Sequence, residues 1–385
     1  MLTDCDDFLM NNNWEFETFL HILILSLILI RILHLLLIHI LIKAYLSKFT
    51  NSNTRPSSRA HHITRPTNLQ PSILSLHTHG SSLVTLGETQ VLCGITLSIG
   101  TPAPSQPTNG EIDVSVQFSP LSGKQYNHYG RIVHDDLDAS ATSSSHKSYS
   151  DPQAIESYIK RTIVSSEMID RSQLGIVEGK SAWRVHVGCM VVNHDGNVVD
   201  AVILGVVRAL VDLKLPSVVV DGEGVSNGSD DNGNGNDNGD GMVRYVNVEE
   251  SEGGDECKEG NNNKPIGKML DFKKICVPLT IGFFQGKMLV DPSLEEESLC
   301  EGMITVVVDA LSLKNVKDDD MDMDVDRDDI GENSRANILT GNVLNLSKTG
   351  GGVLCSVEEI AACAQLAFGR AKELLPIILP SLTEQ

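Results

Sequence analysis

The clearest hydrophobic pattern of the chain begins at Trp183. Apolar and polar residues alternate from there to Gly188, and residues 190–192 continue the run as apolar residues only. An alternation with period two predicts a half-buried strand, and its apolar end predicts that the strand becomes fully buried. Residues 194–197 predict a turn, because Gly196 can take a positive φ at no steric cost.

A buried helix is predicted directly after this turn. Residues 200–215 are apolar on almost every side, and only Arg208, Asp212 and Lys214 interrupt them. A helix of that composition is covered on most sides, and Pro216 ends it. The strand, the tight turn and the buried helix predict a core around which the other elements pack.

Further elements are predicted before this core. Gly87-Glu88 lies between two alternating segments and favours a two-residue hairpin turn with glycine first. Pro152 suits the first turn of a helix, with Asp151 as its N-cap. The predicted elements are strands 82–86, 89–95 and 112–118 and a helix over 152–169.

The chain after the core repeats this order. Residues 276–284 and 288–291 predict a second hairpin, and residues 303–308 predict a third strand of that sheet. Ser356 and Glu359 form a capping box that opens a helix, predicted to run to about Leu375, before Pro376. The order of elements predicts an α+β fold with two similar halves.

Charge is concentrated in two segments. The 385-residue chain has a formal net charge of −21. Residues 221–263 hold 12 acidic and 2 basic residues, and residues 317–332 hold 9 acidic and 2 basic residues. The rest of the chain is therefore only about −4, which excludes a strongly basic nucleic-acid-binding domain. The Gly/Asn/Asp-rich run 222–241 is predicted to be disordered, because it cannot bury apolar surface.

The cysteines predict buried thiols in a reducing compartment. None of the eight forms a C-x-x-C pair, so a zinc site is not expected. They are Cys5, Cys93, Cys189, Cys257, Cys276, Cys300, Cys355 and Cys363.

Residues 18–46 are long and apolar enough to span a bilayer, which takes ~20 residues. Arg31 lies at their centre and costs ~2.5–3.5 kcal/mol on insertion scales, which the many Leu and Ile can outweigh. The acidic residues ahead of the stretch argue against a secretory signal. Three alternatives stay open: a membrane anchor, a segment foreign to the native protein, or a helix masked by packing. If the stretch is a membrane anchor, the basic residues after it would keep the following domain in the cytosol. These residues are Lys43, Lys48, Arg55 and Arg59.

Four motifs in order resemble the RNase PH family, and more specifically a ring subunit of the eukaryotic RNA exosome. The resemblance covers about residues 55–380 apart from the acidic insertions. The motifs are Arg55-Pro56-x-x-Arg59 with Arg65-Pro66, the hairpin Gly80–Gly94, the junction Asn193–Ala201, and the segment Val290–Glu297 (VDPSLEEE). Among ring subunits the chain most resembles the type called ribosomal RNA-processing protein 43. The features that favour this type are Leu215-Pro216 and the strand before Lys124. The 42 and 45 types are closely similar alternatives.

The resemblance implies an RNase PH-like fold of two β-α-β-α halves, similar to ribosomal protein S5 domain 2. The first half is expected at 55–220 and the second at 264–380. Acidic insertions are expected at 221–263 and 317–336, and an extension with the hydrophobic stretch at 1–50.

The resemblance also implies where a phosphorolytic site would lie. Active relatives hold the attacking phosphate with an Arg and a divalent metal with two Asp residues six positions apart. This chain has Val199 at the Arg position and Glu297 and Met303 at the Asp positions, although a shift of one or two residues would bring in Glu301. Val and Met cannot do this chemistry. We therefore expect a non-catalytic subunit without metal or other cofactor, with residues 295–297 as a solvated acidic turn.

Lys124 and Arg131 are the candidates for RNA contact, because their loop (SGKQYNHYGR) mixes basic and aromatic residues. An ordinary polar loop is the alternative. Arg55, Arg59 and Arg65 would either line a ring interface or form local ion pairs.

The expected partners are other RNase PH-type ring subunits, S1/KH cap subunits and RNA in the channel, in nucleus, nucleolus and cytoplasm. An active phosphate-dependent 3′-to-5′ exoribonuclease and a membrane-tethered relative are the alternatives.

Overall fold

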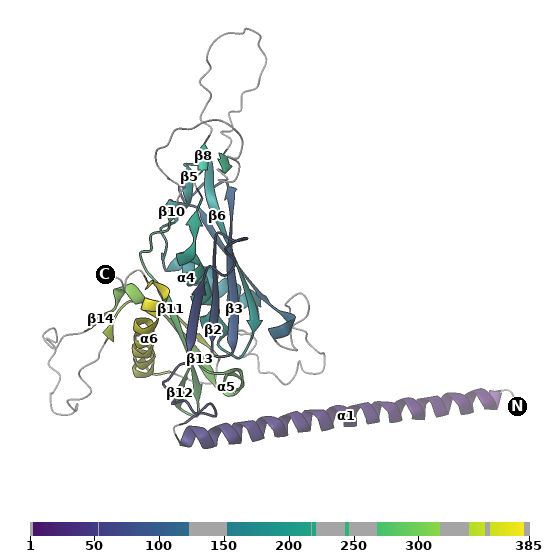
Figure 1. Ribbon diagram of the computed structural model, residues 1–385. Helices are drawn as coiled ribbons and strands as arrows, with labels where there is room; N and C mark the ends of the chain where they lie inside the picture. Colours follow the sequence, from purple (N-terminus) through teal and green to yellow (C-terminus); the bar gives the residue numbers. More distant parts are fainter. Residues whose placement is uncertain are drawn as a thin grey trace, which may run out of the picture.

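The computed structural model describes residues 3–52, 54–122, 152–216, 218–220, 243–245, 268–315, 339–350 and 355–380. Among these residues, two large sheets and the helices α3, α4, α5 and α6 form the body, and a long helix, α1, projects from it (Figure 1). The α+β fold with two halves is confirmed. The acidic insertions lie almost wholly outside the described residues.

The first half is a six-stranded sheet with the order β1-β2-β3-β6-β4, in which β5 also pairs with β6. Strand β4 runs parallel to β6, and helix α3 (Pro152–Ser165) lies in the connection between them. A parallel pair needs such a crossover. The strands are β1 (Thr67–Pro71), β2 (Gly80–Leu86), β3 (Thr89–Gly100), β4 (Glu111–Phe118), β5 (Gly175–Val177) and β6 (Ser181–Asn193).

The second half is a four-stranded sheet with the order β12-β11-β13-β16, covered by helix α6 (Val357–Ile378). Its strands are β11 (Cys276–Phe284), β12 (Lys287–Val290), β13 (Gly302–Asp309) and β16 (Val343–Thr349). The remaining short pairs are β7 (Lys214–Leu215) with β10 (Lys268–Met269), β8 (Val218–Val220) with β9 (Val243–Tyr245), and β14 (Lys314–Asn315) with β15 (Leu339–Thr340).

Helix α4 (Val198–Asp212) joins the halves. It packs on β2 and β3 of the first sheet and on β11 of the second. Every residue from Val198 to Leu210 is buried. One hydrophobic core therefore runs from the first sheet through α4 to the second sheet and α6.

Both predicted hairpins are confirmed, and the glycine of each turn has a positive φ. Gly87 has φ +59°, as a glycine-first turn requires. In the second hairpin Gln285 and Gly286 both have positive φ (50° and 74°), which is the pattern of a type I′ turn.

The prediction that β6 becomes fully buried is wrong. Met190 is 45 % exposed, while its neighbours Cys189 and Val191 are buried on the side where α4 packs. The strand keeps its period of two to the end, so Met190 points to the opposite face.

Three predicted helices have different ends in the structure. Helix α3, predicted over 152–169, ends at Ser165. Helix α4 begins at Val198 and ends at Asp212, because Leu213 is extended and the N–H of Lys214 donates to the carbonyl of His79 (3.1 Å). Helix α6 continues past Pro376 to Ile378. Pro376 lies in its last turn, where its missing N–H and the crowding of its ring against the preceding turn affect only the end of the helix.

Helix α1 (Thr3–Asn51) contains the whole hydrophobic stretch. It leaves the body at the end that carries β12 and α5 (Figure 1). Its apolar segment is not packed along the body, and the window that would span a membrane has no buried residue. Packing against the described residues therefore does not mask it. Among residues 20–49, the part of α1 whose side chains are described, only Leu46 is buried, in an apolar cluster with Phe284, Leu289, Leu299, Cys300 and Met303.

Candidate functional site

Helix α4 starts at the point where both halves meet. The turn after β6 ends with Gly196 (φ +82°) and Asn197 (φ +53°), and Asn197 is the N-cap of α4. A Cβ on Gly196 would lie 2.4 Å from the backbone nitrogen of Leu294. Glycine is therefore required here for two reasons, its backbone angle and the close approach of the second half.

Arg65 and Asp291 form the central ion pair of this junction. Both are buried. The guanidinium donates from Nε to Oδ2 (3.0 Å) and from Nη2 to Oδ1 (2.9 Å) of Asp291, and the backbone N–H of Arg65 adds a third bond (2.7 Å). Nη1 donates to the carbonyl of Asp195 (2.6 Å). This two-point geometry is the strong form of an arginine–carboxylate pair.

Asn197 extends the network to α4 and the second sheet. Its amide donates to Asp291 (2.7 Å) and to Asp200 (2.9 Å). Asp200 also accepts from the backbone N–H (2.8 Å) and the hydroxyl (2.7 Å) of Thr280, and that hydroxyl lies 2.9 Å from the hydroxyl of Thr305. Groups of the protein itself donate these hydrogen bonds to both carboxylates. The network therefore has a structural role and holds the two halves together.

The expectation of a solvated acidic turn at 295–297 is wrong. These residues lie in helix α5 (Leu294–Leu299), and Glu296 and Glu297 are buried. Glu297 accepts from the backbone N–H of Asn197 (2.7 Å), and Glu296 caps the helix by accepting from the N–H of Ser293 (2.9 Å). Only Glu295 is exposed.

Burial changes the protonation of these carboxyls. Desolvation raises the pKa of Glu297 to about 8 and that of Asp200 to about 6, against the lowering effect of their hydrogen bonds. Asp291 is also desolvated, yet its net pKa is lowered because Arg65 and Asn197 outweigh burial. Burial, with help from Arg65, lowers the pKa of His194 to about 4. At neutral pH the junction therefore holds an ionised Asp291 and a largely neutral Glu297.

The three arginines form local contacts, one of the two alternatives predicted for them. Arg55 is buried and donates to the carbonyls of Val290 and His61. Arg59 lies 3.5 Å from Asp291, and Arg65 holds the same carboxylate. All three bind locally around the link between β12 and α5.

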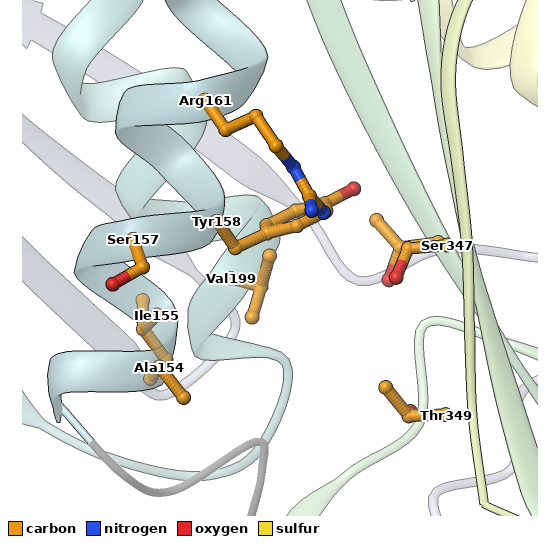
Figure 2. A pocket seen from close by; sticks show the side chains of 9 residues that line it. Ala154, Ile155, Ser157, Tyr158, Arg161, Val199, Ser347 and Thr349 are labelled. Atoms are coloured by element: carbon orange, nitrogen blue, oxygen red, sulfur yellow. The ribbon is translucent and has the colours of Figure 1, made fainter.

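A cavity of about 230 Å³ opens beside this network, between α3, the first turn of α4, β13 and β16. Figure 2 shows Arg161 and Tyr158 of α3 pointing toward Ser347 of β16. The Arg161 guanidinium lies 5.8 Å from the centre of the Tyr158 ring. Thr349 adds a hydroxyl with no hydrogen-bond partner among the described residues. The other lining residues are Ala154, Ile155, Ser157, Val199 and Thr305.

The positions predicted for the lost catalytic groups are separated. Val199 is in the cavity wall. Met303 is buried in the apolar cluster around Leu46, and Glu301 is exposed. Among the described residues no three His, Cys, Asp or Glu side chains converge as a metal site would require.

Lys124 and Arg131 lie outside the described residues, so their prediction stays untested. The cavity residues Tyr158 and Arg161 were missed. They lie three positions apart in α3, and Tyr158 packs against the edge of the core that the buried residues Ile155, Ile159 and Ile163 help to form. A polar pair at this helical spacing was the available signal, but it is equally typical of a solvent-exposed face.

Known proteins match both halves. A model of the 3′ exoribonuclease family, RNase PH, matches residues 64–216 with its domain 1 and residues 274–370 with its domain 2. The exosome complex component Rrp42 of Methanopyrus kandleri is 30 % identical over 247 residues, 63 % of this chain and 72 % of that relative. The chain belongs to the RNase PH family.

Other RNase PH proteins agree with this assignment. The exosome complex component rrp45 of Schizosaccharomyces pombe is 25 % identical and covers 80 % of this chain and 79 % of its own length. A chain of the Archaeoglobus fulgidus exosome with RNA bound to the active site superposes with a TM-score of 0.57 at 22 % identity, over 88 % of this chain and 98 % of that chain. The predicted RNase PH-like fold is confirmed.

Proposed function

We propose that the chain is a non-catalytic subunit of the exosome core ring, of the ribosomal RNA-processing protein 43 type. It supports 3′-to-5′ RNA processing by forming part of a channel that leads RNA to a separate nuclease. Other RNase PH-type subunits would be its ring neighbours and S1/KH proteins its caps. The naming of the relatives as exosome components supports the assembly.

One observation carries the non-catalytic part of the proposal. Val199 stands in the cavity wall at the start of α4, where the resemblance places the arginine that holds phosphate. A branched apolar side chain offers neither charge nor a hydrogen bond to an anion. Met303, at the second predicted metal position, is 4 % exposed in an apolar cluster.

Arg161 favours the second candidate, an active phosphate-dependent exoribonuclease. Its guanidinium lies over Tyr158 in the same cavity and would supply a cation from a different element. Ser157, Ser347 and Thr349 add hydroxyl groups around it.

Co-expression with the other RNase PH-type ring subunits tests both parts. We expect a stable hetero-oligomer by native mass spectrometry, and no phosphate-dependent release of nucleoside diphosphates from RNA by this chain alone. Failure to enter any such oligomer would refute the ring assignment. Release that disappears in Arg161→Ala but persists in Arg171→Ala, a change outside the cavity, would establish the second candidate.

A further inference from the structure

The apolar part of α1 is exposed on every side. From Leu20 to Ile42, eighteen of the residues are Leu or Ile. Seventeen of these are between 39 % and 69 % exposed. At 3.6 residues per turn they cover the whole circumference of the helix. A protein partner or a second copy would cover one stripe, whereas an apolar phase covers all of it.

The dimensions fit a bilayer. Twenty-three residues at 1.5 Å each give a helix of about 35 Å, compared with about 30 Å for the hydrocarbon core. The hydroxyl of Ser26 donates to the carbonyl of Leu23 (2.8 Å), so its hydrogen bond is satisfied inside the helix. Arg31, midway along, is the one permanently charged residue in this segment.

The flanking charges are asymmetric. Residues 1–19 contain five acidic and no basic residues, whereas residues 43–66 contain five basic and no acidic residues. Basic residues remain on the cytosolic side of a membrane. Tyr45 lies just past the apolar segment, where aromatic residues favour the membrane interface.

We propose that α1 crosses a lipid bilayer as a single span from Leu20 to Ile42 and holds the RNase PH body on the cytosolic face. The position of Leu46 sets the distance between the body and the membrane. This residue follows the span by four residues, about 6 Å along the helix, and is inserted among Phe284, Leu289 and Leu299. The β11–β12 end of the second half is therefore next to the membrane surface.

Cell-free translation of the full chain with endoplasmic-reticulum microsomes tests this inference. We expect the chain to stay with the membranes after alkaline carbonate extraction and to float with them in a density gradient. Added protease should digest the body and leave a protected fragment that contains residues before Leu20. The variant Leu29→Arg/Leu33→Arg changes only exposed positions of α1 and should release most of the chain from the membranes. Leu76→Asp, at a position that is 90 % exposed on the body, is the matched control and should float like the parent.

Four results would overturn the proposal. The first two are recovery of the chain in the carbonate supernatant and pelleting without flotation. The third is cleavage of the helix from the body before any protease is added. The fourth is undiminished membrane retention of Leu29→Arg/Leu33→Arg. Ring assembly is read separately by co-expression, so failure of the membrane proposal and failure of the ring assignment give different results.

Discussion

Glu297 follows two other glutamates in the sequence, yet it is buried beside the first turn of α4. Its carboxyl accepts a hydrogen bond from the backbone of Asn197, and burial raises its pKa to about 8 from an ordinary value of 4.5. The folded protein therefore binds one more proton than the unfolded chain between these two pH values. Stability from this group is complete below about pH 4.5 and is lost as the pH rises through about 8.

Replacing Glu297 with Gln should remove this pH dependence. The amide oxygen can still accept from Asn197, and it carries no charge to bury. We expect the free energy of unfolding of Glu297→Gln to equal that of the parent near pH 4.5. Above about pH 8 it should exceed the parent's value by roughly a few kcal/mol. Urea unfolding at both ends of the range measures the difference.

Glu295→Gln is the control, because Glu295 is exposed in the same helix. Its stability profile should follow that of the parent. An identical pH profile for Glu297→Gln and the parent would show that folding does not raise the pKa of this carboxyl.

Arg65 makes a second prediction at the residue scale. Removing it leaves Asp291 buried without its guanidinium partner, so Arg65→Met should destabilise the protein by about 3–5 kcal/mol. Arg184→Met removes a largely exposed pair with Glu111 (3.0 Å) and should cost less than about 1 kcal/mol. Chemical denaturation measures the free energy of unfolding of both variants. Equal losses of stability would contradict the conclusion that burial makes the Arg65–Asp291 pair more important.

At the scale of elements, local chemistry predicted the hairpins and caps correctly. Gly87 and the Ser356–Glu359 capping box are fixed by their own sequence and appear as expected. The burial of Glu297 and the early end of α4 were not predictable in this way. Both depend on hydrogen bonds between groups that are far apart in the sequence, Asn197 with Glu297 and His79 with Lys214.

Gly80 is an example of such a close approach. A Cβ there would lie 2.7 Å from the carbonyl oxygen of Ala209 and 2.9 Å from the Cα of Leu213, at the end of α4. Gly80→Ala should therefore force β2 and α4 apart and cost about 1–3 kcal/mol. At Gly188 the nearest atom is 3.9 Å away, so Gly188→Ala should change stability by less than about 1 kcal/mol. Thermal unfolding of both variants tests this, and a neutral Gly80→Ala would contradict it.

At the scale of the molecule, the motifs predicted the fold because they lie where its elements connect: the first hairpin, the junction before α4 and the link after β12. The cavity was not predictable, since its walls come from α3, α4, β13 and β16, which are far apart in the sequence. Val199 was the one cavity residue that the sequence identified.

The shared core predicts that both halves unfold together. Trp183 reports on the first half once Trp14, the other tryptophan, is changed to Phe. The buried thiol of Cys276 reports on the second half through pulse labelling. We expect both urea transitions to coincide. Separate midpoints would mean that α4 and the Arg65–Asp291 pair do not couple the halves.

The buried Glu297 also affects the heat measured when the whole molecule unfolds. Near neutral pH, unfolding should release about one proton from this carboxyl to the solvent. The buffer takes up that proton and adds its own heat of protonation to the calorimetric enthalpy. Unfolding should therefore register less heat in an amine buffer, whose protonation is strongly exothermic, than in phosphate, although the protein undergoes the same change in both.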